Sequence, residues 1–486
     1  MNENKRVIAT LLCVVMVVLT IFAGKYSTLE ETVEVYDNDS LVVWYTDDSL
    51  TDYLNAMAVD YHEKFGVRVI PKLRAGDDYV ESIYHASIDE TGAPDLYIVG
   101  SDSLEKAYMC GVASMIEDPR SVVSDVNFPK SALDATMYHN QRVAYPYYFE
   151  TTALLYNESY LREMATNKVT AELAKTPDEE DEEAEDLSGI DPEILIEERI
   201  NQCIPTTFEG LLTIADEYDA PEGVETIFKW DVRDIFYNYF FVGSYINLGG
   251  EFGDDSNIID VYNMDSVKAL QVFQDMNQFF SFESADVTYS QVVDEFIEGK
   301  LIFATVTSDA LKAIEEAKAA GEFSYEYGLS TIPDLNDEMS TRSLAVTNVL
   351  AVNGYSDKRD QANALAQFLS ISQAGSLYDR TGKLPTKLGA IPDDSPAYTF
   401  VNEYQFSVPM PKLMATSNSW LLMEGTFADA WSGADVSGCL KELSEQLKHQ
   451  VTGEAVTEEY IKLETEEEEI EYLDEEALKE EAQKEE

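Results

Sequence analysis

The chain has 486 residues, of which 45% are hydrophobic and 11% aromatic, which is ample for about two or three compact globular units. Its formal net charge of −60 would repel nucleic acid and an anionic membrane surface, which excludes both as binding partners of the folded body.

The N-terminus carries the pattern of an exported protein. Lys5 and Arg6 precede an apolar run over residues 7–24, which fits either a signal peptide or an uncleaved membrane anchor. Because basic residues stay on the cytoplasmic side, the body of the protein is expected outside the membrane. The polar, acidic residues 25–38 form the expected tether. We expect a membrane-tethered protein, which would be secreted if residues 1–24 are cleaved.

Strands and helices alternate from Leu41 to Asp102. Strands are expected over residues 41–47, 67–70 and 96–99, and helices over 50–64 and 78–87. Gly66 ends the first helix. The alternation predicts an α/β unit with a mainly parallel sheet, in which ligands usually lie beyond the carboxyl ends of the strands. Asp47, Asp48 and Asp102 lie at such ends.

The segment Gln141–Leu161 is expected to form two short strands with one carboxylate between them. Aromatic residues favour a strand over 144–149. Pro146 cannot donate to a ladder, so it places this strand at a sheet edge or interrupts it. Glu150 follows, and the apolar residues 153–156 form the next strand. Glu150 is therefore either a turn residue or a group held for a ligand.

The rest of the chain adds helices and strands around two acidic blocks. Residues 171–200 contain a Glu/Asp run that cannot be buried, so a solvated or disordered insertion is expected. Further helices are expected over 207–218 with Thr207 as N-cap, 266–280, 362–369 and 420–431, and strands over 301–304 and 344–352. After about Thr452 the chain becomes a Glu-rich tail that we expect to be helical in places but not packed.

The exported body contains three cysteines, namely Cys110, Cys203 and Cys439. An odd number without short spacing argues against a disulfide framework and against a thiolate metal site. Each is expected to be a small buried apolar residue.

Five segments, in their order along the chain, resemble the extracellular solute-binding proteins of ABC importers, in the family that contains maltodextrin-binding and other sugar-binding proteins. They are LVVWYTD with YHEKFGVRV, TGAPDLYIVGSDSLEKAYMCGVASMIE, QRVAYPYYFETTALLYNESYL, IPTTFEGLL, and FIEGKLIF with SLAVTNVLAV. The third is similar to the family's first crossover and the fifth to its second hinge. Together they span about residues 40–435.

The resemblance implies an α/β, periplasmic-binding-protein-like fold. It has two lobes, a ligand cleft between them, and chain crossings as the hinge. Lobe 1 would comprise residues 39–150 and 348–398, and lobe 2 residues 151–345 and 399–455. Residues 171–200 would be an insertion in lobe 2, and residues 456–486 an acidic tail.

The same resemblance implies five ligand-binding residues. Asp48, Asp102 and Glu150 align with sugar-contacting carboxylates, and Tyr239 and Trp420 with aromatic residues of the cleft. Carboxylates accept hydrogen bonds from hydroxyls, and aromatic faces pack on sugar C–H surfaces. Alternatively, Asp48 and Asp102 are helix caps, and Tyr239 belongs to the core.

Two departures from the family bear on the ligand. Maltodextrin binders carry a tryptophan where this chain has Val99, and Thr305–Ala310 replace a second tryptophan-bearing loop. With these two stacking surfaces lost, a different sugar or a smaller polar solute is as plausible as maltodextrin.

Neither an enzyme nor a metal or other cofactor is expected. The four histidines show no metal-ligand spacing; they are His62, His85, His139 and His449. Hydrolase, P-loop and dinucleotide fingerprints are lacking. Asp47 and Asp48 could suggest glycosidase carboxylates, but adjacent strand residues point to opposite faces. Tyr145, Tyr147 and Tyr148 could suggest an iron-binding relative, although alternating strand tyrosines more often pack.

The expected function is capture of a small solute, a sugar or oligosaccharide first, by hinge closure and its delivery to ABC permease subunits. The membrane is a partner only through the N-terminal segment. The alternative is a surface sensor or structural binding protein that kept the fold without transport, which the acidic insertion and tail motivate.

Overall fold

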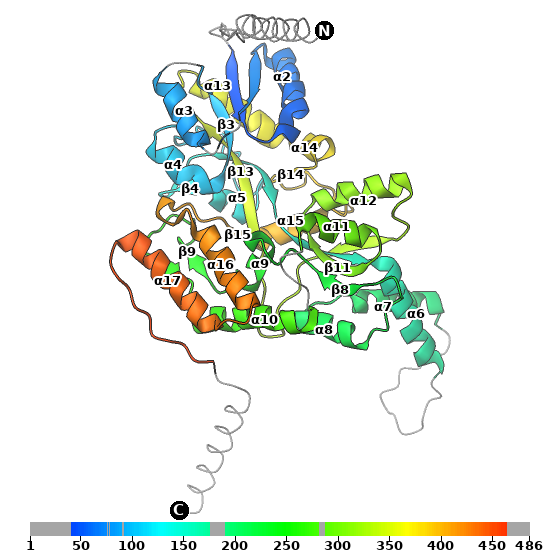
Figure 1. The fold of residues 1–486 in the computed structure, drawn as a ribbon. Helices are drawn as coiled ribbons and strands as arrows, with labels where there is room; N and C mark the ends of the chain where they lie inside the picture. The colour runs from blue at the N-terminus through cyan, green and yellow to red at the C-terminus, as the bar shows by residue number, and fades with distance from the viewer. Residues whose placement is uncertain are drawn as a thin grey trace, which may run out of the picture.

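The computed structural model describes residues 40–74, 76, 78–89, 92–174, 190–280 and 287–463. Their strands form two main sheets, which lie in the upper and lower halves of Figure 1. The N-terminal run 1–24 and the tether 25–38 lie outside these residues. Among the described residues, no helix has the length and apolar character that a membrane span requires.

The first sheet contains seven strands in the order β14-β6-β13-β3-β1-β2, with β15 paired to β13. They are β1 (Leu41–Tyr45), β2 (Val69–Leu73), β3 (Leu96–Gly100), β6 (Tyr145–Glu150), β13 (Leu344–Val352), β14 (Leu384–Pro385) and β15 (Val408–Pro409). β1 is parallel to β2 and β3, as the alternation of strands and helices predicts. β13 runs antiparallel to β3 and β6.

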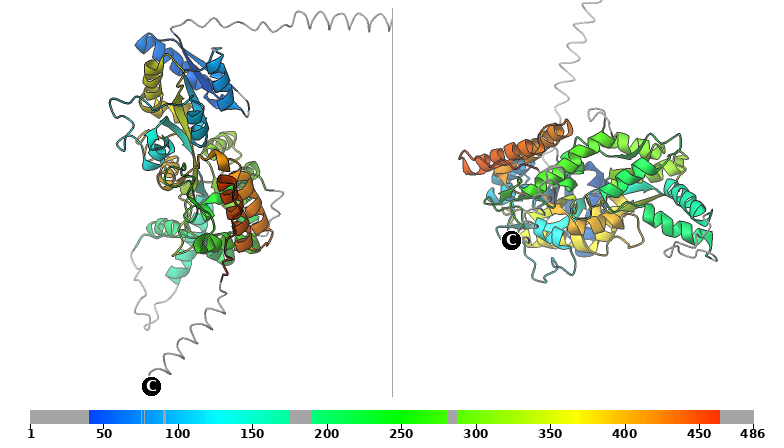
Figure 2. Two further views of the ribbon diagram at one scale, coloured as in Figure 1. Left: turned by 90° about the vertical axis from the view of Figure 1, so that its left-hand side faces the viewer. Right: turned by 90° about the horizontal axis from the view of Figure 1, so that it is seen from below.

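Helices surround this sheet in Figures 1 and 2. They are α2 (Thr51–Phe65), α3 (Tyr79–Ile88), α4 (Leu104–Met109), α5 (Lys130–Ala135), α13 (Arg359–Gln367) and α14 (Ala374–Thr381), and a hairpin of β4 (Met137–Tyr138) and β5 (Gln141–Arg142) lies near α5. Gly66 ends α2 with φ of 74°, a left-handed conformation that glycine adopts without steric cost. The helix α2 buries Tyr53, Met57 and Tyr61 against the core that contains β1.

The second sheet has the order β12-β7-β11-β8. Its strands are β7 (Ala153–Asn157), β8 (Thr226–Lys229), β11 (Leu301–Val306) and β12 (Tyr327–Ser330). The helices around it are α6 (Glu158–Ala174), α7 (Pro192–Cys203), α8 (Phe208–Glu217), α9 (Ile235–Asn238), α10 (Met264–Phe280), α11 (Tyr289–Ile297), α12 (Asp309–Ala320), α16 (Ser419–Trp431) and α17 (Val436–Thr452), with the hairpin β9 (Asn247–Leu248) and β10 (Ile259–Asp260). Thr207 accepts a hydrogen bond from Gly210 N–H at 3.0 Å, so its predicted N-cap role is confirmed.

The chain passes from one sheet to the other between β6 and β7. At this crossing Thr151 Oγ1 donates to the carbonyl of Leu344, at the start of β13, over 2.8 Å. The helix α15 (Tyr398–Phe406) supports both segments, because the Tyr404 ring stacks on Phe149 with centroids 3.9 Å apart. Glu403 of the same helix accepts a hydrogen bond from Ser343 Oγ at 2.6 Å. The chain returns to the first sheet between β12 and β13, where Ser343 lies. Side chains of α15 therefore contact both crossings between the sheets.

The strand β6 shows the interruption expected at Pro146. Its pairing with β13 runs in one register up to Asn348 opposite Tyr148 and then shifts, so that Val349 faces Pro146. On its other side β6 pairs with β14 only at Tyr148 and Phe149. Pro146 therefore lies where the missing N–H leaves no gap in a continuous ladder.

Several expectations were wrong or only partly met. Cys203 is buried, as expected, but Cys110 and Cys439 are half exposed; all three are free thiols. Of the acidic tail, residues 453–463 pack along α17, where Glu458 pairs with Lys448 and the carbonyl of Ile461 accepts from Ser437 Oγ at 2.6 Å. Residues 464–486 lie outside the described residues. The central acidic run 175–189 of the insertion lies outside the described residues, whereas its flanks belong to α6 and α7.

Candidate functional site

A lysine that the sequence did not single out lies between two carboxylates beside the first crossing. Lys383 Nζ donates to Glu150 Oε1 at 2.7 Å and pairs with Asp47 Oδ2 at 2.9 Å. Its ammonium lies 5.7 Å from the centroid of the Tyr148 ring. The side chains of Lys383, Asp47 and Glu150 are 23%, 27% and 39% exposed. These four residues form a partly solvent-exposed group, which we call the Lys383 cluster.

Strand register brings Lys383 to Glu150. In the β14–β6 pair Leu384 faces Phe149 and Pro385 faces Tyr148, so the residue before Leu384 comes opposite Glu150. Gly382 ends α14 with φ of 76° and turns the chain toward β14. Burial lowers the pKa of Lys383, but its pairing with Glu150 and Asp47 outweighs burial and raises the pKa above its ordinary value. Lys383 is therefore a cation at neutral pH.

The cap at the end of β1 is Asp47 rather than Asp48. Asp47 Oδ1 accepts hydrogen bonds from the N–H of Ser49 at 3.0 Å and from Ser49 Oγ at 2.6 Å. Burial raises the pKa of Asp47, but hydrogen bonds from Ser49 and Lys383 outweigh it and lower the pKa. Asp48 opens the short 3-10 helix η1 (Asp48–Leu50) and is exposed. The helix-cap role that the sequence offered as the alternative for Asp48 thus belongs to Asp47.

Asp102 has different neighbours. It lies in the short 3-10 helix η2 (Ser101–Ser103), and its half-buried carboxylate accepts from the backbone N–H of Ser103. Burial raises its pKa, and the charge of Lys412 partly opposes this rise. Within the described ranges, no hydrogen bond or ion pair joins Asp102 to the Lys383 cluster.

Lys412 is a deeply buried cation. Its side chain is 1% exposed, and Nζ donates to the carbonyls of Phe252 and, at 3.3 Å, of Asp134. Burial lowers its pKa to about 8, although Asp254, Asp134 and Asp102 act in the opposite direction. This lysine connects the segment after β15 to α5 and to the loop after β9.

The structure brings Tyr239 and Trp420 together. Their ring centroids lie 5.9 Å apart at an interplanar angle of 56°. Tyr239 is 2% exposed, as its alternative core role requires, whereas Trp420 at the start of α16 is half buried. Tyr239 also lines a cavity of about 470 Å³, together with Lys130 and Asp134 of α5 and Arg342. The five predicted ligand residues thus fall into three settings. Glu150 belongs to the Lys383 cluster and Asp48 follows its member Asp47, Asp102 lies near Lys412, and Tyr239 contacts Trp420.

A second group of aromatic rings and carboxylates lies at one edge of the second sheet. β8 and β11 are parallel, so the loops after their carboxyl ends lie side by side. The rings of Tyr237 and Tyr289 stack there with centroids 4.9 Å apart, and the Tyr289 hydroxyl donates to Asp309 Oδ1 at 2.7 Å. Burial raises the pKa of Tyr237, and Asp309, Asp234 and Asp231 add to this rise. The family resemblance pointed to Tyr239, close to Tyr237 in the chain, but not to this pair, because Tyr289 comes from a separate helix.

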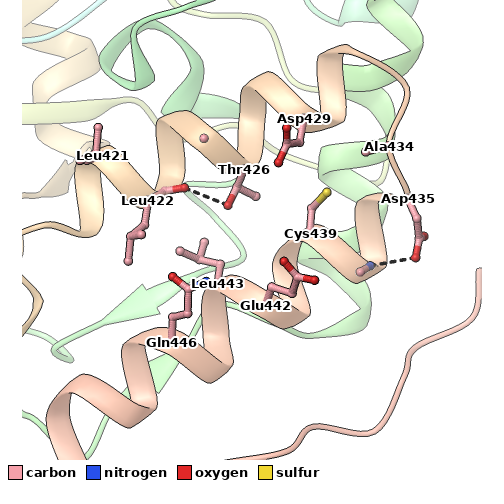
Figure 3. Close-up of a pocket in the computed structure, with 12 residues that line it drawn as sticks. Leu421, Leu422, Thr426, Asp429, Ala434, Asp435, Cys439, Glu442, Leu443 and Gln446 are labelled. Atoms are coloured by element: carbon pink, nitrogen blue, oxygen red, sulfur yellow. Dashed lines mark hydrogen bonds between the residues drawn. The ribbon is translucent and has the colours of Figure 1, made fainter.

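A further cavity, of about 550 Å³, lies between α16 and α17 (Figure 3). Side chains of α16 and α17 face it, and its lining combines leucines with carboxylates: Leu421, Leu422, Leu443, Asp429 and Glu442. None of the five predicted ligand residues lines this cavity.

The Lys383 cluster supplies the hydrogen-bonding groups that suit a polar neutral solute. Carboxylate oxygens accept hydrogen bonds from hydroxyls, and an ammonium donates to hydroxyl oxygens. The stacked pair at the second sheet offers less to a ligand, because Tyr237 is buried and Tyr289 is half-buried. In the part of the chain that the structure describes, no three His, Cys, Asp or Glu side chains gather as a metal site would require.

The fold is similar to that of several solved binding proteins. A cyclo/maltodextrin-binding protein complexed with maltotetraose is 18% identical, with a TM-score of 0.67 over 87% of this chain and 100% of its own. An extracellular solute-binding protein from Staphylococcus aureus in complex with maltose is 18% identical, with a TM-score of 0.66 over 86% and 98%. The maltose-binding periplasmic protein from Listeria monocytogenes, in complex with maltose, is 19% identical, with a TM-score of 0.63 over 87% and 100%.

These similarities confirm the two-lobe α/β fold that the sequence predicted. Residues 56–399, more than half of the chain, match the family described as bacterial extracellular solute-binding protein. A match of this length shows the family, whose proteins are exported and bind solutes. This chain therefore belongs to the bacterial extracellular solute-binding proteins.

Proposed function

We propose that this protein captures a carbohydrate for an ABC importer and delivers it to the permease subunits in the membrane. The main support is the Lys383 cluster, which offers partly exposed carboxylates and a cation beside a chain crossing. The similar folds bear names of proteins that bind maltose or maltodextrins. At 18–19% identity these three proteins share the fold with this chain, and a sugar ligand is our proposal for it.

The ligand would lie between two lobes that close on it. Lobe 1 would comprise residues 39–150 and 348–398, and lobe 2 residues 151–345 and 399–455. In support of this division, the crossing at Thr151 separates a strand of the first sheet from a strand of the second. Closure would be a hinge motion at the crossings that α15 supports, with the ligand selecting the closed state.

Glu150, Asp48, Asp102, Tyr239 and Trp420 are the proposed ligand residues. Glu150 has the strongest support, because it ends β6 at the crossing and its side chain is 39% exposed. The proposed cellular arrangement has residues 1–24 in the membrane and the body outside it, with residues 25–38 between them.

Titration calorimetry of the exported body with a sugar panel tests this function. The panel contains glucose, galactose, mannose, maltose and maltotriose, with amino acids and polyamines as other solute classes. Saturable binding of at least one sugar, weakened at least about tenfold in Glu150→Ala, is the expected result. Binding of no sugar at millimolar concentration would refute the carbohydrate proposal.

A further inference from the structure

We propose that Lys383 is a specificity-determining residue that, together with Glu150, recognises two adjacent hydroxyls of the ligand. This inference rests on the proposed function and adds to it the chemical feature that the site selects. It concerns a residue outside the five that the family resemblance implies.

The first support is the unused hydrogen-bonding capacity of the pair. Glu150 Oε1 is bonded to Lys383, whereas Glu150 Oε2 accepts no hydrogen bond from any residue in the described ranges. An ammonium has three N–H donors, and Asp47 and Glu150 take two of those on Lys383. One acceptor and one donor therefore remain, on side chains that are partly exposed.

The second support is geometry. The remaining acceptor and donor belong to groups whose bonded atoms lie only 2.7 Å apart. Two adjacent ring hydroxyls of a sugar have oxygens about one hydrogen-bond length apart. One hydroxyl would donate to Glu150 Oε2 and its neighbour would accept from Lys383 Nζ. A ligand with a single hydroxyl would satisfy only one of these groups.

The third support is charge. The Lys383 cluster holds two carboxylates and one ammonium, and the exposed Asp48 adds another negative charge next to it. An anionic ligand would be repelled. A cationic ligand would compete with Lys383 for the same carboxylates. A neutral diol keeps both ion pairs intact, so it is the class that this arrangement favours.

The test uses Lys383→Met, which removes the charge but keeps an unbranched side chain, and Lys383→Arg, which keeps the charge. Lys387→Met is the matched control, because Lys387 lies shortly after β14 and its Nζ donates only to the carbonyl of Leu388, at 3.0 Å. The full exported body is titrated calorimetrically with the sugar from the panel that it binds best and with each monodeoxy derivative of that sugar.

Wild type and Lys387→Met are expected to prefer the parent sugar over two adjacent monodeoxy derivatives by about tenfold or more. Lys383→Met is expected to lose this preference at one of the two positions, where the parent then binds no better than the derivative. Lys383→Arg should recover part of it. A purely structural role would instead weaken the parent and all derivatives by the same factor.

The outcomes separate the inference from the function on which it rests. If wild type binds no sugar, the carbohydrate function fails and the inference fails with it. If wild type binds a sugar and Lys383→Met keeps the full pattern of preferences, only the inference fails. Tighter binding by Lys383→Met would also overturn it, because Lys383 would then compete with the ligand.

Discussion

Lys412 gives the stability of this protein a pH dependence that can be worked out from its surroundings. It is 1% exposed and bonded only to backbone carbonyls, and burial lowers its pKa from an ordinary 10.5 to about 8. The folded protein therefore releases this proton at lower pH than the unfolded chain does. Unfolding takes up a proton between about pH 8 and 10.5, so the lysine's contribution to the free energy of unfolding rises across this window.

The size of the effect follows from the shift. A change of one pKa unit corresponds to about 1.4 kcal/mol. Above about pH 10.5 the lysine is neutral in both the folded and the unfolded protein, so no charge has to be buried on folding. As the pH falls to about 8, burying the charge would lower the free energy of unfolding by about 3 kcal/mol. Lys412→Met has no proton to exchange at this site, so its stability should lack this rise.

Urea denaturation measures the free energy of unfolding of wild type and of Lys412→Met at several pH values. The pH runs from about 7.5 to about 10.5, which spans the folded and the ordinary pKa of this lysine. The free energy of unfolding of wild type should gain about 3 kcal/mol on that of the variant across the range. Lys312→Met, which removes a lysine that is 75% exposed, controls for the loss of one positive charge. Parallel curves for wild type and Lys412→Met would refute this reasoning.

Three further changes test other parts of the structure. Glu150→Ala should lower the free energy of unfolding by less than about 1 kcal/mol, since the Glu150 side chain is 39% exposed. Calorimetry should show sugar binding at least about tenfold weaker. A large loss of stability with binding intact would make Glu150 structural. Burial raises the pKa of Glu403, so the stability that its carboxyl contributes below the ordinary pKa of 4.5 should be lost as the pH rises through the raised pKa. Urea denaturation of Glu403→Gln should lack this loss. A pH profile of stability that equals that of wild type would contradict this. Thr207→Ala removes the N-cap bond to Gly210 and should cost about 1 kcal/mol in urea denaturation, with sugar affinity unchanged.

Local signals in the sequence predicted most of the fold. The strand β13 has the bounds 344–352 that its apolar run indicated, and Gly66 and Thr207 end and begin helices as their residue types predict. These features depend on residues within a few positions of each other. The order of the five family segments then predicted the two-lobe fold, which the similar structures confirm.

The site was harder to predict because it depends on long-range pairing. Lys383 meets Glu150 only through the register of β14 against β6, which no short pattern around Lys383 reveals. The sequence did offer one signal, since Gly382 before Lys383 and the Leu-Pro pair after it indicate a helix end followed by a short strand. Likewise, Asp47 and Asp48 are equivalent in the sequence, and only the turn geometry makes Asp47 the cap.

The central claim is that a sugar is bound between the two lobes and closes them. Small-angle X-ray scattering of the exported body, without sugar and with a saturating concentration of the sugar that binds best in calorimetry, measures this most directly. The account predicts a smaller radius of gyration with sugar for wild type, and a lesser decrease for Glu150→Ala at the same sugar concentration. An unchanged radius for wild type at a concentration where calorimetry shows full occupancy would contradict binding by lobe closure.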